Sequence, residues 1–427
     1  MPMLKKIKIK PSFLNPSILL FGTLIVLGSF YRYIRIYPFF NNVQYLPYIL
    51  EVIIFIFVLL KFKKITNNWD NMDALFSIFI LSSSISYLIL GIQIGYWNQI
   101  EFLLTYILPT FMYYFVKNNN KITFYMIDHL LKIFVIVAFV FLSTEFYTTN
   151  YLGVPFFNFA QYWDSTGNIG YHASAVNYLF LGKLNRPWGP MALPQSSGSM
   201  FASFFTYFLA KHVYLVPIHK SNKKTFFYLI ISFLGTYISG SRTALTTIAV
   251  IILILYAKSS FKLIFASVVS VVLLVIFVKF GSQEASVEGF KNVIPETSEG
   301  LTIDSIERFF EVIYGQGSPT PNNKVIGTSE IHILNQIFII GIVSFFILFL
   351  IAIKLKGFNK KQKEIYIINN LYSRAFTIYI LSSAIGSLHY DVIFRYPNNN
   401  IILIMIGYIS REFMKVNKYR LPVAITT

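Results

Sequence analysis

Apolar stretches of about 20 residues recur almost from one end of the chain to the other, and that is the length a helix needs to cross roughly 30 Å of hydrocarbon. Only 13% of the side chains are charged, far below the roughly 25% of soluble domains. The sequence therefore predicts an all-α polytopic membrane protein. We expect about twelve transmembrane helices, at residues 16 to 36, 43 to 60, 74 to 95, 99 to 116, 125 to 147, 195 to 214, 225 to 240, 243 to 257, 262 to 280, 331 to 353, 371 to 389 and 397 to 412.

The basic residues are distributed asymmetrically about these stretches. The net charge of +18 resides mainly in short connections that fall on one side of a single alternating scheme. Because cytoplasmic connections of membrane proteins are enriched in Lys and Arg, we expect this side and both termini to be cytoplasmic. The same placement makes nucleic acid an improbable partner. The basic connections are Lys5 to Lys10, Lys61 to Lys64, Lys117 and Lys121, Lys211 to Lys224, Lys258 and Lys262, Lys354 to Lys363, and Arg411 to Arg420.

Two connections on the opposite, outer side are much longer than the others, and loops of such length are usually functional or disordered. We interpret residues 1–427 as one integral membrane domain with a first large outer loop at 148–194 and a second at 281–330. The first is rich in aromatic residues, which favours a surface folded onto the membrane. In the second we expect a short amphipathic helix near Ile303 to Tyr314.

Isolated cations on the outer side are the candidate site residues, and two of them are arginines that shortly precede predicted helices. Arg186 precedes Pro187 and Trp188, and Arg242 follows Ser241 in a tight turn. An arginine at membrane depth is costly unless it faces a wet cavity or an anion. A planar guanidinium suits bidentate binding of phosphate, and a turn leading into a helix adds backbone donors. The alternative is that either arginine reaches out to lipid headgroups.

Two further arginines each have an acidic residue nearby in the sequence with which they could pair. Arg308 follows Asp304 by four residues, so the two would share a helix face and form a surface ion pair. It could also close over a substrate from an outer loop. Arg395 follows Asp391 in the same way, and local pairing is its default interpretation.

His332 and Glu330 stand where the second outer loop returns to the membrane. A histidine titrates near neutrality, and Glu330 could orient it or replace it as a proton acceptor. The alternative is a histidine at a helix end with a carboxylate favoured by the helix dipole. The two interpretations stay open on sequence grounds.

Several other chemistries lack a signature. No histidines have helical ligand spacing, no outer carboxylates cluster, and no glycine-rich nucleotide loop or serine hydrolase motif is present. With no Cys, the chain has no thiolate ligand or nucleophile. We therefore expect no metal and no cofactor. An outer site rich in arginine and aromatic residues suits a lipid-linked pyrophosphate that carries a sugar chain.

The chain resembles the O-antigen polymerase and ligase superfamily, which includes the Wzy-type polymerases of surface polysaccharide. The resemblance covers the whole predicted topology, and three short motifs carry it by their order and placement. These are Arg186 to Pro190 with Pro194 to Gly198, Ser239 to Ala244, and Gly327 to His332 running into Gly341 and Ile342. One departure is that ligases usually have adjacent His and Asn at the third motif, whereas His332 precedes Ile333 and the asparagine is Asn335.

The resemblance implies a metal- and nucleotide-independent glycosyltransferase at the outer face of the cytoplasmic membrane. It would join polyprenyl-pyrophosphate-linked oligosaccharide repeat units, with membrane lipids, a chain-length regulator and other assembly proteins as partners. The catalytic residues it implies are Arg186, Arg242, His332 and Glu330, and the substrate-binding ones are Arg308, Trp188, Ser241 and Arg395. A ligase that moves a finished glycan is the nearest alternative. A polysaccharide or lipid-linked sugar transporter is the alternative from another class.

Overall fold

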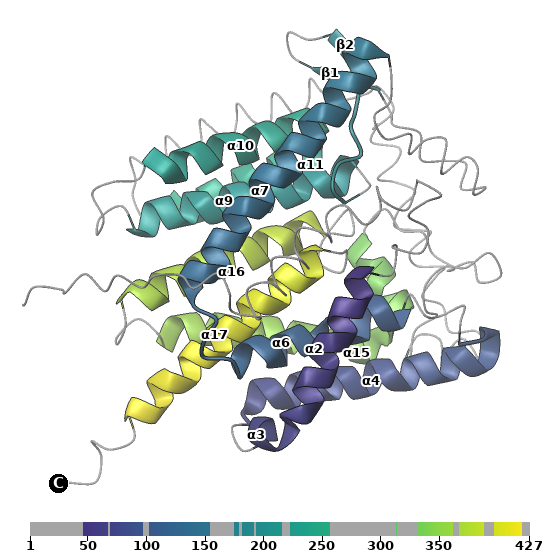
Figure 1. Cartoon of the computed structure of the whole chain (residues 1–427), viewed down its shortest axis with the longest axis vertical. Coiled ribbons are helices and arrows are strands. Elements are labelled where there is room, and N and C mark those ends of the chain that lie inside the picture. Colours follow the sequence, from purple (N-terminus) through teal and green to yellow (C-terminus); the bar gives the residue numbers. More distant parts are fainter. Residues whose placement is uncertain are drawn as a thin grey trace, which may run out of the picture.

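The computed structural model describes residues 46–66, 69–96, 102–153, 175–178, 182–191, 194–215, 223–256, 313, 332–361, 367–387 and 397–420. This part of the chain is mostly helical, and a helix occupies the place of each predicted apolar stretch within it (Figure 1). The stretches predicted at 16 to 36 and 262 to 280 lie outside the described residues, as does most of the second outer loop. The helices are α2 (Leu46–Leu60), α3 (Phe62–Thr66), α4 (Asn71–Ile94), α6 (Thr110–Lys117), α7 (Phe124–Tyr147), α9 (Pro194–Leu215), α10 (Lys223–Ser239), α11 (Arg242–Tyr256), α15 (His332–Lys361), α16 (Ile367–Gly386) and α17 (Asn398–Arg420).

Helix boundaries follow local chemistry. Asp70 caps α4 by accepting from the amides of Met72 and Asp73, and the Asp73 carboxylate accepts from the Asp70 amide in return. Thr123 caps α7 in a similar way, by accepting from Met126. Proline begins α9, where its missing N–H costs nothing. The ends of these helices are therefore encoded by single polar residues or prolines next to the apolar runs.

Three features interrupt the plain succession of helices. The stretch predicted at 99 to 116 is split into the π-helical turn η2 (Leu103–Ile107) and α6, with Pro109 between them. The stretch predicted at 331 to 353 continues to Lys361 as α15 but is broken at Gly341, whose φ of 79° is accessible mainly to glycine. The first outer loop contains the π-helical turn η3 (Thr148–Leu152) and an antiparallel hairpin of β1 (Ala175–Tyr178) and β2 (Gly182–Asn185), which periodicity alone did not predict.

The described helices form two groups joined through a middle pair. Helices α7, α9, α10 and α11 make one group, and α2, α4, α6 and α15 make the other, with α16 and α17 between them (Figure 1). Helix α9 packs against α10, α11 and α16, while α17 packs against α6. Ser203 and Ser383 are hydrogen-bonded across α9 and α16 at 3.0 Å. The chain segments that carry Arg186 and Arg242 both lie in the α9 group.

Apolar side chains cover the outside of the helices, and small hydroxyl side chains lie inside. Helix α4 exposes Ile78, Leu81, Ile85 and Leu88, which repeat at helical spacing, while Ser83 on the same helix is completely buried. A comparable stripe on α15 comprises Ile342, Phe346, Phe349 and Ile353. Within the described residues, two helical segments, Asn71–Ile92 and Phe124–Leu152, are long and apolar enough to cross a membrane. In a soluble bundle such stripes would face the core.

One end of the bundle is built from buried ion pairs, and we call it the lysine end. Lys117 at the end of α6 lies 2.9 Å from Asp70 and also pairs with Asp73. Lys211 near the end of α9 lies 2.5 Å from Asp128, near the start of α7, and Lys132 lies 2.6 Å from the same carboxylate. Lysines from the predicted cytoplasmic connections thus tie neighbouring helices together.

Candidate functional site

Arg186 follows strand β2 in a loop whose backbone is held on both sides of it. Before it, the Asn150 side chain donates to the Asn185 carbonyl at 2.9 Å and accepts from the Asn185 amide at 2.7 Å. This pair of bonds fixes the end of the hairpin against η3. The Arg186 side chain itself is half-buried.

Glu145, near the end of α7, holds the loop after Arg186. Its carboxylate accepts from the amide of Trp188 at 2.8 Å and from that of Gly189 at 3.0 Å, and it is almost completely buried. Hydrogen bonds to a carboxylate are roughly twice as strong as neutral ones. A buried acid at the end of an apolar helix is thereby joined to two successive backbone donors of the arginine loop.

Gly189 is required by the same arrangement. Its φ of 66° belongs to the left-handed region, which residues with a Cβ rarely adopt. A Cβ there would lie 2.7 Å from both Leu142 Cδ1 and Ser197 Oγ, well inside van der Waals contact. The Arg186 to Pro190 motif therefore includes a glycine for conformational and steric reasons together.

Ser197 connects the loop to the first turn of α9. Its hydroxyl donates to the Trp188 carbonyl at 2.7 Å and accepts from the Met191 amide at 3.1 Å. Trp188 is only 4% exposed. The Trp188 side chain therefore packs as part of the loop framework in this structure.

The second arginine motif, the turn before Arg242, packs against Gly198 of α9, the residue after Ser197. Gly240, with φ of 60°, turns the chain between α10 and α11, and Arg242 begins α11. The buried Ser241 hydroxyl accepts from the Ala244 amide at 3.3 Å and so caps this helix. A Cβ on Gly198 would lie 2.5 Å from Ser241 Cβ and would also collide with Ser239, so the turn packs directly on that glycine.

Two adjacent residues of α9 therefore contact the two arginine motifs. Ser197 is hydrogen-bonded to the Arg186 loop, and Gly198 packs against the Arg242 turn. We call this region, residues 185–191 and 239–242 with Ser197 and Gly198, the arginine end. Arg242, like Arg186, is half-buried. The segments that carry the two arginines thus pack on one turn of α9, and a guanidinium group can bind the oxygens of a phosphate or pyrophosphate.

The other predicted site residues are less fully placed. Arg308, Glu330 and Arg395 lie outside the described residues, and His332 is placed only as the first residue of α15. Whether these four approach the arginine end stays a prediction. No three His, Cys, Asp or Glu residues gather as a metal site in the described ranges.

Sequence reasoning missed Glu145, Asn150 and Ser197, which position the arginine loop. Glu145 had a signal, because it is the one charged residue in the second half of α7, which is otherwise almost wholly apolar. An ionisable group in such a segment is a functional hypothesis by default. Asn150 had none, and Ser197 belonged to the Pro194 to Gly198 motif without a predicted role, since the role of each depends on which backbone groups the fold brings to it.

A second set of polar contacts lies between the middle helices. Tyr379 donates to Asn398 Oδ1 at 2.5 Å, and Asn398 donates to Ser383, which donates to Ser203 of α9. Further along, Asn400 donates to the buried Glu51 of α2 at 2.7 Å. Polar side chains from α2, α9, α16 and α17 thus form hydrogen bonds between helices inside the described bundle.

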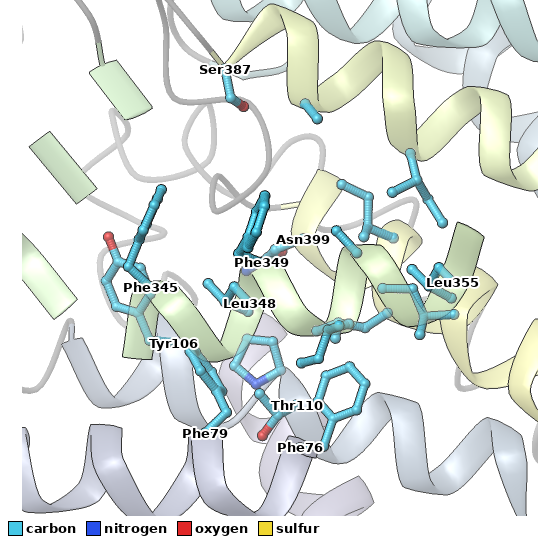
Figure 2. A pocket seen from close by; sticks show the side chains of 18 of the residues that line it. Phe76, Phe79, Tyr106, Thr110, Phe345, Leu348, Phe349, Leu355, Ser387 and Asn399 are labelled. Atoms are coloured by element: carbon cyan, nitrogen blue, oxygen red, sulfur yellow. The ribbon is translucent and has the colours of Figure 1, made fainter. Parts of the chain in front are cut away.

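An apolar cavity of about 300 Å³ lies between α4, α6, α15, α16 and α17 (Figure 2). Its size is at the lower end of ordinary small-molecule sites, about 300–1,000 Å³. The residues that line it include Phe76, Phe79, Tyr106, Thr110, Phe345, Leu348, Phe349, Leu355, Ser387 and Asn399.

Comparison with known proteins does not assign the chain to a family. No protein-family model, no curated protein and no solved structure matches it. The function therefore has to be inferred from the sequence and from the geometry of the arginine end.

Proposed function

We propose that this chain is a polymerase that joins polyprenyl-pyrophosphate-linked oligosaccharide repeat units into surface polysaccharide. It would act at the outer face of the cytoplasmic membrane, which it would cross about twelve times with both termini inside. The observation that carries the proposal is the packing of the Arg186 loop and the Arg242 turn on adjacent residues of α9. The resemblance of the same two motifs to those of O-antigen polymerases supports it.

The membrane placement draws support from the two ends of α7. Asp128 belongs to the lysine end and Glu145 to the arginine end, and they lie 17 residues apart on this helix. At about 1.5 Å per residue that is about 25 Å, close to the roughly 30 Å of a hydrocarbon core.

The chemistry that the proposal requires is a glycosyl transfer with pyrophosphate departure. The oxygen of an acceptor hydroxyl forms a bond to the anomeric carbon of the growing chain, while the bond from that carbon to the pyrophosphate oxygen breaks. The bonding electrons leave with the pyrophosphate, and the hydroxyl proton passes to Glu330 or His332. Arg186 and Arg242 neutralise the charge that develops on the leaving group, with Arg308 and Arg395 as further contacts. Neither a metal nor a nucleotide takes part in this scheme.

The proposal is tested by incubating the purified protein with its lipid-linked repeat unit, without nucleotide or added metal, and resolving products by size. We expect a ladder of extended chains that falls at least about 100-fold in Arg186→Ala and Arg242→Ala, the order of loss for removing a transition-state donor. Arg374→Ala is the matched control, since Arg374 stacks on Tyr214 near the lysine end, 5.9 Å from its ring centroid. Normal ladders from both site variants would overturn the proposal.

The two alternatives predict different products in that assay. A ligase would transfer a finished glycan once and give no ladder. A transporter would leave the substrate unchanged and move it across vesicle membranes. Two observations favour the transporter as the second candidate, the break of α15 at Gly341 and the buried Glu51–Asn400 pair, because carriers often use broken helices and interior polar groups.

A further inference from the structure

The apolar cavity between α4, α15, α16 and α17 is long enough to hold a segment of a hydrocarbon chain. The residues that line it on α15 run from Phe345 to Leu355, about 15 Å at about 1.5 Å rise per residue. Its volume is about 300 Å³, and most of the side chains that line it are aromatic or aliphatic. Such a lining accepts hydrocarbon and disfavours charged groups.

The cavity communicates with the apolar outside of the bundle. Phe349 lines it and is also 57% exposed on the stripe of α15, and Ala352 beside it is exposed as well. A chain in the surrounding bilayer can therefore enter from the side. Among the described residues that line the cavity, none is charged.

The cavity also has a polar end. Ser387, at the end of α16, and Asn399, in the first turn of α17, line the cavity at the helix ends that the proposed topology places outside. Figure 2 shows Ser387 at one edge and Phe76 and Phe79 at the opposite one. Asn398, next to Asn399, is joined through Ser383 to Ser203 of α9, the helix on which both arginine motifs pack. A polar group at this end would lie on the arginine side of the bundle.

We propose that this cavity holds the isoprenoid chain of the polyprenyl lipid, with its phosphate end toward Ser387 and Asn399. The choice of this lipid rests on the proposed function. The lining agrees with this choice, because apolar side chains line most of the cavity, and Ser387 and Asn399 lie at the end where the phosphate would be.

The test uses a polyprenyl monophosphate with a photoreactive group in its chain, added to the full-length protein in phosphatidylcholine nanodiscs. We expect crosslinks on α15 and α17 around Phe349 and Ile402, both of which line the cavity. Ala352→Phe, which narrows the opening, should lower the crosslinking yield at least ten-fold. Ile353→Phe is the matched control, since Ile353 is 52% exposed on the same helix and does not line the cavity.

Other results separate the ways in which the inference could fail. Crosslinks spread over the outer stripe of α4, or equal yields from Ala352→Phe and wild type, would overturn the inference even if arginine-dependent ladders form. Competition by excess phospholipid as strong as that by unlabelled polyprenyl monophosphate would overturn the choice of lipid. Because the probe carries no sugar and no pyrophosphate, cavity crosslinks in a protein that makes no ladder would support the site while the polymerase proposal failed. Crosslink mapping on the wild-type protein tests the site even if Ala352→Phe does not fold.

Discussion

Helix α7 carries one buried carboxylate near each end, and the two are used differently. Asp128 binds the side chains of Lys132, Lys211 and Tyr207, so it joins helices through charge. Glu145 accepts from two successive backbone amides and so fixes the path of a loop. The lysine end is thus built to hold helices together, and the arginine end is built to hold backbone in one conformation. A difference of this kind predicts that damage at the two ends will have different consequences.

The largest expected loss of stability comes from the lysine end. Asp128→Ala would leave two lysines and a tyrosine hydroxyl without their shared carboxylate in a buried site. Removing one partner of a buried pair typically costs about 3–5 kcal/mol. We expect a loss of that order by denaturant unfolding in detergent micelles.

If the two ends act separately, the Asp128→Ala protein that does fold should extend chains at the normal rate per folded molecule. Activity must therefore be divided by the folded fraction, which size-exclusion chromatography measures. A folded variant with no activity would show that the lysine end also takes part in function, and the contrast between the two ends would fail.

Glu145→Ala should instead act mainly on activity. It leaves the buried amides of Trp188 and Gly189 without the carboxylate, at about 1–3 kcal/mol for each unsatisfied group, and releases the loop that carries Arg186. We expect chain extension to fall at least about 100-fold, which corresponds to about 2.7 kcal/mol of transition-state stabilisation. The measurement is the rate of ladder formation at saturating donor.

Glu145→Gln provides the control for charge. The amide keeps one acceptor oxygen for the loop, so it should retain more activity than Glu145→Ala if positioning is the role. Equal losses in the two variants would mean that the negative charge matters and that the positioning interpretation is wrong.

The sequence predicted the positions of the helices better than it predicted the structure of the site. Apolar length placed helices such as α4 and α9 within a few residues, because the requirement is local and continuous along the chain. The break at Gly341 and the π-helical turn before Pro109 were not predicted, since a Gly or Pro in an apolar run is compatible with several backbone paths. The hairpin was missed for a related reason, as its two strands have only four residues each.

For the site, the residue types were predicted and their supports were not. Arg186 and Arg242 stood out because charge is costly near a membrane. That Gly198 would contact Ser241, 43 residues later in the chain, depends on the packing of α9 against the turn between α10 and α11. Trp188 and Ser241, which the resemblance assigns to substrate binding, are buried in the framework here, so that assignment stays a prediction.

A smaller difference in activity, between alanine substitutions at Gly189 and Gly153, separates the contribution of packing from that of backbone strain at the arginine end. Gly189 and Gly153 have nearly the same φ, 66° and 64°, but only Gly189 has neighbours where a Cβ would be. Alanine at either position incurs the left-handed penalty of about 1–2 kcal/mol. We expect Gly189→Ala to lose about ten-fold more activity than Gly153→Ala in the ladder assay. Similar losses would show that the contacts with Leu142 and Ser197 do not set the loop position.

The smallest expected effect is on stability, at an exposed ion pair of the kind that is buried at the lysine end. Lys415 pairs with Glu412 at 2.8 Å, but its side chain is 45% exposed, so solvent screens the pair. Lys415→Ala should change the free energy of unfolding by no more than about 1 kcal/mol, the usual value for an exposed pair. Lys211→Met, which removes a buried partner of Asp128, should cost several-fold more on the same measurement. If the two variants were equally stable, burial would not be what gives the lysine end its strength, and the contrast between the two ends of α7 would have to rest on the arginine end alone.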